Sequence, residues 1–388
     1  MLPNMHLPLI VYDSLVRTGV LIDDNWTTKV TSLSAQWQMY GGHWSLNHTA
    51  NVSQSVGEEW LDDGIGRHLE LYAPSAIKIW EGFVNSVTFN VGGVSITRGP
   101  LIGGVQNRNS VAYSTVDTST TPPTMGIRES TAWAEDSISI ARYGQHEEVI
   151  SVGGATATSA AQISATALAE RAEPPTSESD NLANSAVPSI TIAALGYIHW
   201  LGTYAVDLTT VGEQNASAKL AAVLGADPNG IFSTNYGGIE TNTIQVGAYD
   251  RDYRTADTIV QAIVGLGNVT NERMMFTIQN GRIAEYKTVP SSPAYQRRIA
   301  AAAAQLENYQ QGGWVQPYEA DPGEIVFYTD LLAGKPPATT NTIAKSDPRY
   351  LRIERSTYNL PVAMSLQGEQ FSQLDQIMKR YGLGGTTA

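Results

Sequence analysis

The stretch WEGFVNSVTFNVGGVSITRGP, Trp80–Pro100, alternates apolar and polar side chains on both sides of a Gly-Gly pair. Val87, Phe89 and Val91 alternate with hydroxyl and amide residues, and the alternation resumes after Gly92-Gly93. Successive side chains of a strand point to opposite faces, and glycine readily supplies the positive φ of a tight turn. The stretch therefore predicts a β-hairpin with one buried apolar face and one polar face.

Strand signals continue from this hairpin in both directions. β-Branched and aromatic residues stand between Gly, Pro and Asn breaks in Asn25–Tyr40, His68–Pro74 and Asn109–Val116. After the polar, proline-containing loop Asp117–Gly126, the alternating segment Asp136–Gly144 predicts another strand. We therefore expect a β-barrel or sandwich in the first 150 residues.

Helical patterns begin beyond this region. The alanine-rich segment Gly154–Glu173 predicts a helix that ends at Pro174-Pro175. Two more helices are predicted at Ala216–Leu224 and Thr255–Leu266, and Asn280-Gly281 lies between strand-forming residues, as in a hairpin turn. Residues 210–290 therefore form a compact α+β unit in this interpretation.

The sequence predicts a β-rich α+β fold in five parts. We expect a β-barrel domain in residues 1–150 and a helix with a polar linker in 151–188. Strands that return to the barrel sheet follow in 189–209, and then the α+β insert in 210–290. Residues 291–388 are expected to form a second β-barrel portion. It includes a helix in the segment RRIAAAAAQLENY, Arg297–Tyr309, and a C-terminal helix at Gln370–Arg380.

Composition limits the possible functions. The chain has 388 residues, no cysteine and a formal net charge of −13 at pH 7. The lack of cysteine excludes disulfides, thiolate chemistry and cysteine-ligated zinc. With 24 Lys and Arg residues, the chain lacks the concentrated positive charge that grips phosphate backbones. We therefore expect no nucleic acid as a direct ligand, and no sequence-specific binding of it.

The chain is also poor in charge and in long apolar runs. Charged residues make up 16% of the chain, against roughly 25% in typical soluble domains. A neutral polar surface suits large contacts with other subunits, although a β-rich protein explains it equally well. No apolar run reaches the roughly 18 to 20 residues of a membrane span, and the N-terminus lacks the features of a signal peptide. We expect synthesis in a cytosol and no stable membrane segment.

Enzymatic motifs are not evident. His43 and His48 do not form a metalloprotease pair, and the sequence has no nucleophile elbow or phosphate-binding loop. The acidic segment GEEWLDDGIG, with Glu58, Glu59, Asp62 and Asp63, lacks the ligand spacing of a calcium loop and is best interpreted as a solvated turn. We expect no catalytic residue, metal site or cofactor, and therefore no enzyme.

One alternative belongs to a different class of protein. Trp26, Trp37, Trp44 and Trp60 crowd the first sixty residues and are candidates for a sugar-stacking platform with Glu58, Glu59 or Asp62. A carbohydrate-binding or glycoside-cleaving β-protein would use such a platform. Burial in a β-core or at a subunit contact is the commoner role of large aromatic residues.

An ordered series of motifs resembles a known family. IWEGFVNSV is followed by NSVAYSTV, AEDSISIARYGQHEEVI, the alanine-rich helix, ITIAALGYIHWLGTYAVD, the α+β unit and finally DPGEIVFYTDLL with LRIERSTYNLPVAMSLQ. The order resembles the baseplate hub or tail-tip hub proteins of tailed bacteriophages, in which a W-x-G strand, a strand that ends in Tyr-Gly and an alanine-rich helix recur. The resemblance covers most of the segment from Ile79 to Leu366.

The resemblance implies tail-tube-like β-barrel domains, with Val84–Thr97 in a barrel wall. It implies a homotrimeric ring that joins a tail tube or distal tail protein to a central spike or fibre in the virion. The net negative charge would then let DNA pass without sticking during ejection. Family hubs often carry a lysozyme, peptidase or spike module, which this sequence lacks, so we expect a separate spike or fibre protein. A hexameric distal tail or tube-like ring subunit is the structural alternative.

Interface candidates follow from the family-like strands. Trp80, Tyr113 and Tyr143 lie in those strands, and a core role is the alternative for Trp80 and Tyr143. The loop from Ser119 to Met125 is the other candidate for contact with a neighbouring subunit, through Ser119, Pro122, Pro123 and Met125.

Overall fold

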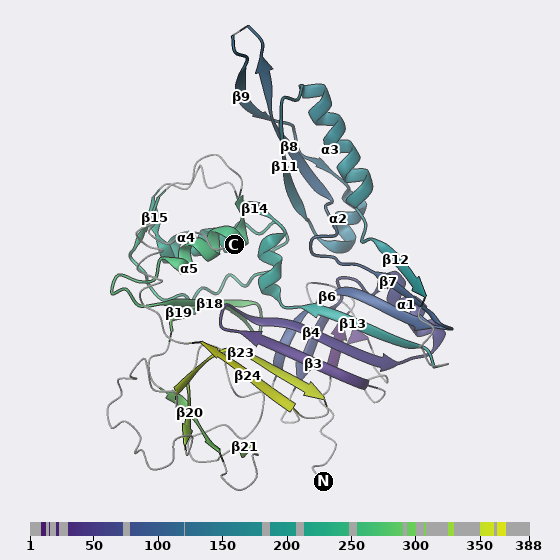
Figure 1. The fold of residues 1–388 in the computed structure, drawn as a ribbon, viewed down its shortest axis with the longest axis vertical. Coiled ribbons are helices and arrows are strands. Elements are labelled where there is room, and N and C mark those ends of the chain that lie inside the picture. The colour runs from purple at the N-terminus through teal and green to yellow at the C-terminus, as the bar shows by residue number, and fades with distance from the viewer. Residues whose placement is uncertain are drawn as a thin grey trace.

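The computed structural model describes residues 9–12, 15, 21–22, 30–72, 78–119, 121–180, 187–206, 213–247, 254–289, 293–299, 306–307, 325–329, 350–360 and 363–369. A large curled sheet forms the body (Figure 1). Its main path runs in the order β2-β1-β5-β6-β13-β4-β3-β23-β22-β20-β21. Its strands are β1 Leu9–Tyr12, β2 Leu21–Ile22, β3 Val30–Gln38, β4 Gly41–Asn51, β5 His68–Tyr72, β6 Lys78–Val91, β7 Val94–Arg98, β12 Thr176–Asp180, β13 Ser189–Leu195, β18 Met274–Gln279, β19 Ile283–Thr288, β20 Pro293–Ile299, β21 Leu306–Glu307, β22 Ile325–Thr329, β23 Tyr350–Leu360 and β24 Ala363–Glu369.

The hairpin predicted from Trp80–Pro100 is confirmed as β6–β7. Gly92 and Gly93 form its turn with φ of 58° and 87°, the left-handed values that a two-residue hairpin loop needs at both positions. Phe89 is buried, whereas Thr88 and Thr97 join their hydroxyls at 2.9 Å on the polar face. The alternation of the sequence therefore becomes the two faces of the ribbon.

A strand from much later in the chain closes the centre of the sheet. β13 pairs antiparallel with β6 on one side and with β4 on the other. Ile190, Ile192 and Ala194 point to the buried face, in register with the pleat of both neighbours. The sheet is thus continuous only when residues 189–195 are in place.

Close packing beneath β13 explains the Trp-x-Gly sequence of β6. Trp80 is fully buried, and Gly82 lies against the main chain of β13. A Cβ on Gly82 would overlap the carbonyl oxygen of Leu195 and would lie 2.5 Å from Cη2 of Trp80. Glycine is therefore required here because two strands and an indole meet without room for a methyl group.

Gly82→Ala is expected to lower the free energy of unfolding by about 2–3 kcal/mol, because main chain rather than a flexible side chain blocks the new methyl group. Urea denaturation of the full chain measures this loss. Gly265→Ala is the matched control: it lies at the end of a helix with open space around it and is expected to stabilise by up to about 1 kcal/mol. Equal effects of the two substitutions would contradict the packing argument.

The α+β unit predicted at residues 210–290 packs on one end of the sheet (Figure 1). Its hairpin β18–β19 turns at Asn280-Gly281, as predicted, and β18 joins β4 through two residues. Both predicted helices are confirmed, and Leu220 and Ile259 are among the residues that bury their inner faces. The elements of this part are the 3-10 helix η2 Tyr197–Gly202, α4 Ala216–Gly225, α5 Ala256–Gly265, β14 Ala205–Val206, β15 Gln214–Asn215, β16 Gln245–Val246 and β17 Arg254–Thr255.

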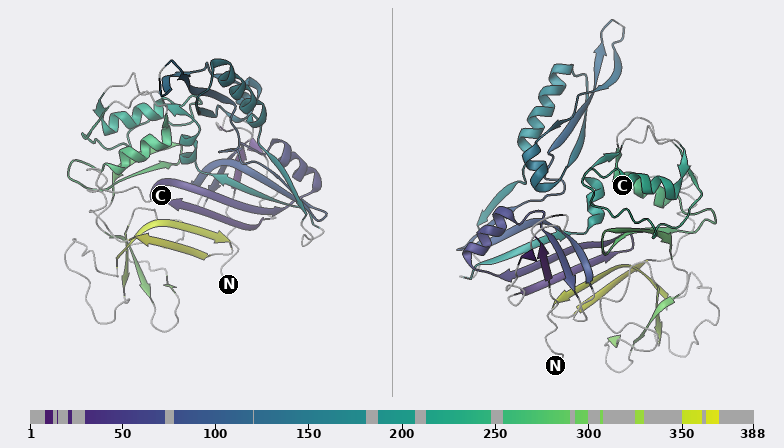
Figure 2. Two further views of the ribbon diagram at one scale, coloured as in Figure 1. Left: turned by 45° about the horizontal axis from the view of Figure 1, so that its top comes forward. Right: turned by 180° about the vertical axis from the view of Figure 1, so that it is seen from behind.

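A second, smaller sheet projects from the body (Figure 2). It holds β8 at its centre, with β11 parallel on one side and β9 and β10 antiparallel on the other. Residues 108–153 therefore contribute a sheet of their own rather than strands of the large sheet. Its elements are β8 Arg108–Asp117, β9 Thr124–Ser130, β10 Ala134–Glu135, β11 Glu147–Gly153 and the helices α2 Ser137–Tyr143 and α3 Ala157–Arg171.

The prediction of a strand at Asp136–Gly144 is wrong, because this segment forms α2. Asp136 caps the helix by accepting hydrogen bonds from the backbone N–H groups of Ile138 and Ser139, both at 3.0 Å. Ser139 and Tyr143, four residues apart, are buried on its inner face, and Gly144 ends it with φ of 79°. Alternation over so short a segment fitted both periods, and the capping aspartate decides between them.

Four further expectations differ from the structure. The solvated turn predicted at GEEWLDDGIG lies mostly in the helix α1, Gln54–Asp63, capped by Ser53. The linker after Pro175 begins with β12, which pairs with β7, and the strands predicted after Leu195 give way to η2. Arg297–Ile299, predicted to be helical, lies in β20 because it pairs with β22.

The fold class expected from the sequence, a β-rich α+β protein, is confirmed. The boundaries of the five expected parts stay predictions, and the C-terminal helix predicted at Gln370–Arg380 lies outside the described residues. Within the ranges that the structure describes, none of the helices has the length and apolar character needed to cross a membrane.

Candidate interaction surface

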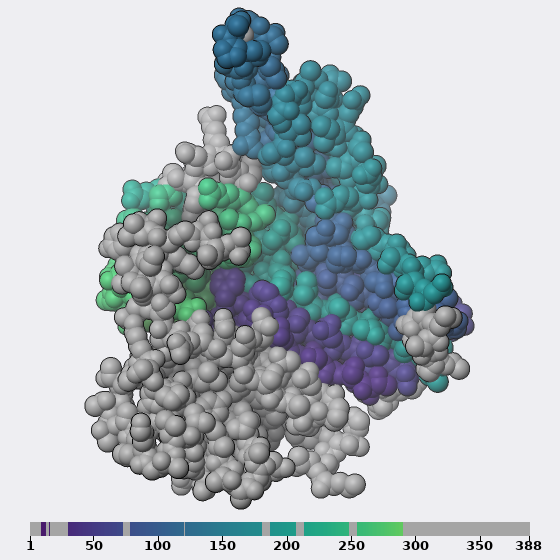
Figure 3. All heavy atoms as spheres, viewed as in Figure 1, coloured from purple at the N-terminus to yellow at the C-terminus, as the bar shows by residue number. Residues whose placement is uncertain are grey.

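Residues 108–171, here called the β8–β11 lobe, pack on the body at their inner end and project away from it at their outer end (Figure 3). β8 runs through its centre, so β9 and β11 lie on opposite sides of the same sheet. Each of these two strands has β8 as its sheet neighbour in the described part of the chain. The lobe therefore presents two strand edges away from the main sheet.

The helix α3 covers one face of the lobe. Thr156 caps it by accepting a hydrogen bond from the backbone N–H of Ser159 at 3.2 Å, and its buried Ser164 bonds reciprocally with Asn109 of β8. Val111, Tyr113, Ala155 and Ala160 form a small apolar core between helix and sheet. This core fixes the angle at which the lobe holds its hairpin.

Three large apolar side chains are exposed near the outer end of the lobe. The side chains of Val116, Met125 and Ile127 near the tip of the β8–β9 hairpin are 46%, 58% and 86% exposed. All of β9 is exposed apart from the half-buried Gly126. Apolar residues gathered on an exposed edge strand mark a surface that another chain covers, or one that is prone to aggregate.

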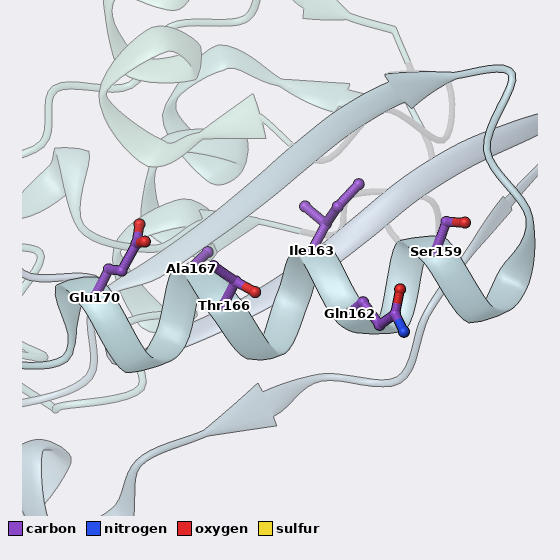
Figure 4. Close-up of a pocket in the computed structure, with 6 residues that line it drawn as sticks. All are labelled: Ser159, Gln162, Ile163, Thr166, Ala167 and Glu170. Atoms are coloured by element: carbon purple, nitrogen blue, oxygen red, sulfur yellow. The ribbon is translucent and has the colours of Figure 1, made fainter.

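A shallow groove runs along α3 beside the lobe's sheet. Figure 4 shows Ser159, Ile163 and Glu170 pointing from the helix toward the strand that leads into it, β11. Ile163 packs at the edge of the small core, together with the half-buried Ile150 and Val152 of β11. The groove therefore has an apolar floor that continues to the edge of the sheet. It is lined by Ser159, Gln162, Ile163, Thr166, Ala167 and Glu170.

The interface candidates from the sequence fall into two groups. Ser119, Pro122, Pro123 and Met125 are exposed at the tip of the lobe. Three aromatic side chains are instead buried within the chain: Trp80 is 0% exposed, Tyr143 1% and Tyr113 6%.

The three buried aromatics have internal partners. Tyr143 donates its hydroxyl to Glu173 at 2.9 Å, and Tyr113 donates to Glu129 at 2.7 Å. Trp80 lies in the main core, which is the alternative to an interface role that the sequence analysis gave for this residue. Their roles in the described structure are therefore packing and internal hydrogen bonding.

Sequence reasoning missed Ile127, Ile150, Val152 and Ile163. The segment TMGIRES, Thr124–Ser130, does alternate Met125 and Ile127 with small or polar residues, which is a strand signal. The proline pair before it suggested a loop, and the segment that forms β11 was not predicted as a strand of its own.

A second cluster gathers polar groups deep in the main sheet. His68, Glu70 and Glu81, all buried, bring their side chains within reach of one common point. Lys78 Nζ lies 2.9 Å from Glu70 Oε1 and also contacts Glu81 Oε2. The ammonium group therefore supplies the positive charge that the two carboxylates need in a low-dielectric site.

Neighbouring groups complete this cluster. Glu70 accepts from the Tyr72 hydroxyl at 2.8 Å and lies 3.3 Å from His68 Nε2; against the cost of burial, hydrogen bonds from His68, Lys78 and Tyr72 lower its pKa to about 2. Glu81 Oε1 accepts a hydrogen bond at 2.8 Å from the backbone N–H of Arg282, which lies in the β18–β19 turn. The cluster joins the sheet to the α+β unit and is enclosed, which suits a structural role.

The tryptophans of the carbohydrate alternative do not form a platform among the described residues. Trp37 is 8% and Trp60 2% exposed, and Trp37 donates its ring N–H to the carbonyl of Ile79 at 2.9 Å. Trp44 packs edge-on against His199, and Trp26 lies outside the described residues. Glu58 and Glu59 bond instead to Gln54 and Arg67 on or beside α1.

Comparisons with known proteins add one likeness. No protein-family model and no curated protein sequence matches the chain. The chain is similar to the crystal structure of the prophage MuSo2 43 kDa tail protein from Shewanella oneidensis. That match has 6% sequence identity and a TM-score of 0.44, and it covers 95% of this chain and 98% of the other.

Proposed function

We propose that this chain is a non-enzymatic structural subunit of a phage tail tip or baseplate. In this role it forms a ring-like hub, a homotrimer, that joins the tail tube or distal tail protein to a central spike or fibre. Its place is the virion, after synthesis in the host cytoplasm, and it needs no cofactor.

The observation that carries the proposal is the β8–β11 lobe. A lobe with two strand edges and three exposed apolar side chains near its tip suits contacts between subunits. By contrast, the buried acidic cluster is closed and neutralised by Lys78, and two of the candidate sugar-binding tryptophans are buried in the core. The described surface therefore favours assembly over catalysis.

The motif order supports the same class of protein. Two of the elements on which the resemblance to tail-tip hubs rests keep their predicted form: the Trp-x-Gly strand is the central β6, and the alanine-rich helix is α3. The third, the strand expected to end in Tyr-Gly, is instead the helix α2. The net charge of −13 fits a passage whose wall repels the DNA backbone.

Light scattering and negative-stain images of the same purified sample test this function. A trimeric ring with a hole of tube width is the expected result. A hexameric ring would favour a distal tail or tube-like subunit instead. A protein that stays monomeric at every concentration, with specific retention on a glycan array, would contradict the proposal and favour the carbohydrate-binding alternative.

A further inference from the structure

We propose that β9 of one copy of this chain adds to the outer edge of β11 of a second copy, so that their lobes join in one continuous sheet. The inference rests on the proposed function, because it names the surface through which a ring of subunits would close. Each copy gives one strand edge and receives another, which makes the contact head-to-tail.

The strand directions allow this pairing. Within one copy, β9 runs antiparallel to β8 and β11 runs parallel to β8. If a second lobe extends the sheet beyond β11, with its α3 on the same side of the sheet and its β8 parallel to the first β8, then its β9 lies antiparallel to β11 of the first copy. Adding a strand to an edge satisfies main-chain donors and acceptors on both sides at the usual spacing of about 4.8 Å.

The apolar side chains of the two edges lie on the same face. Tyr113 is in register with Glu129 of β9 and with Val152 of β11, so these side chains share a face of the sheet. Ile127 lies on that face two residues from Glu129, beside Gly126 at the bulge where the register of β9 with β8 shifts between Arg128 and Met125, and Ile150 lies on it with Val152. It is also the face that α3 covers, since Tyr113 packs with Ala160.

The groove along α3 is the space that such a strand would fill. A strand added outside β11 would direct Ile127 of the second copy toward Ile163 and Ala167, which line that groove. The most exposed apolar side chain of the lobe would thereby be buried on an apolar floor. The groove thus offers Ile163 and Ala167 as apolar contacts for the exposed Ile127.

Charge favours this contact for two copies of an acidic chain. Like charges make most surfaces of a −13 chain repel one another. The outer half of β11, Ile150–Gly153, carries no charge, and β9 carries one of each sign, Arg128 and Glu129. These two segments therefore add no net charge to the contact, although Glu170 lines the groove, and the same chain supplies the added strand.

Crosslinking tests the pairing directly, because the full chain has no cysteine. Single variants Ile127→Cys and Ile150→Cys are purified, mixed and treated with a short bismaleimide. Its length still joins the two cysteines if the register between the two strands is shifted by two residues. The mixture is expected to give a covalent dimer, and the double variant a ladder of larger species. Within one copy the two positions are two strands apart, roughly 10 Å across the sheet, so mass analysis of crosslinked peptides from the mixture identifies the contact between copies.

Each single variant alone is the control and is expected to stay monomeric on a denaturing gel. If either single variant crosslinks to itself and the mixture gives no additional product, the two lobes pair about a two-fold axis and the proposal is overturned. Assembled rings that give no crosslink would also overturn it, while leaving the hub function standing. Protein that neither assembles nor crosslinks contradicts both proposals.

A second variant measures the strength of the contact. Ile127→Lys is expected to weaken self-association at least about tenfold, because a charge would enter the apolar groove. Val269→Lys is the matched control: it places the same charge at an apolar side chain outside the lobe that is 59% exposed, and it is expected to leave association unchanged. Equal effects of the two variants, with unchanged circular dichroism, would overturn the assignment of the edge.

Discussion

Acidification from pH 6.5 to pH 4 is expected to unfold the protein. Burial lowers the pKa of His43, His48 and His146 from 6.5 to about 4. Since the folded state keeps these rings neutral while the unfolded state protonates them, stability is fully present above pH 6.5 and is lost as the pH falls toward 4. Each histidine contributes up to about 3 kcal/mol to this loss, against a total stability of about 5–15 kcal/mol.

The geometry supports neutral rings. His43 Nδ1 accepts a hydrogen bond from the backbone N–H of Glu81 at 3.1 Å, which requires that nitrogen to be unprotonated. Urea denaturation at pH 8, 6.5, 5.5 and 4.5 measures the loss. Protonation of Glu70 does not contribute to the loss of stability between pH 8 and 4.5. Its pKa is lowered, so its stabilising contribution disappears only below about pH 4.5.

His48→Gln is the diagnostic variant for the pH effect. Glutamine does not titrate, so the variant is expected to show a shallower loss of unfolding free energy between pH 6.5 and 4.5, whatever its stability at pH 8. Glu58→Gln, on the exposed side of α1, is expected to keep the original slope. A stability that is flat across this range in the unsubstituted protein would contradict the prediction.

Lys78→Met is expected to lower the free energy of unfolding by about 3–5 kcal/mol at pH 7. The substitution leaves Glu70 and Glu81, 0% and 2% exposed, without the ammonium group that lies between them. Two buried carboxylates without a counter-ion repel each other and lose their best hydrogen-bond donor. The variant should therefore gain stability relative to the unsubstituted protein as the pH falls from 7 to 5, because protonation relieves the repulsion.

Two further variants separate this effect from lost packing. Lys287→Met removes a lysine whose partner is the half-exposed Glu285, at 2.9 Å, and should change stability by at most about 1 kcal/mol. The double variant Lys78→Met with Glu81→Gln removes one carboxylate along with the lysine and should recover part of the loss. No recovery in the double variant would show that the loss came from packing rather than from charge.

Local signals in the sequence predicted much of the fold. The β6–β7 hairpin, α3, both helices of the α+β unit and the Asn280-Gly281 turn were all predicted, because turn glycines, periodicity and proline stops act within a few residues. The prediction failed at α2, where a short apolar pattern fitted both periods, and at Arg297–Ile299, where pairing with β22 overrode the helical propensity of the segment. At α2 the capping Asp136 was the local signal that the prediction passed over, whereas the pairing of β20 with β22 depends on a distant segment.

The candidate surface was predicted only in part. The tip residues Ser119, Pro122, Pro123 and Met125 are exposed in the structure, and a polar, proline-containing loop is expected at a surface. Ile127 and the groove beside β11 were not predicted, because they depend on which strands lie at the edges of a sheet. That order is set by contacts between distant segments, such as the parallel pairing of β8 with β11 across α2.

The late arrival of β13 affects how the chain folds during synthesis. β4 and β6 are complete by residue 91, but the strand that separates them begins at Ser189. At a translation rate of about 5–20 residues per second, the ribosome needs roughly 5–20 s to make the intervening segment. For that time the two nascent strands have no partner on their facing edges, so they must avoid pairing with each other or with strands of neighbouring nascent chains. Chaperones that bind extended apolar segments would act on this chain in that interval.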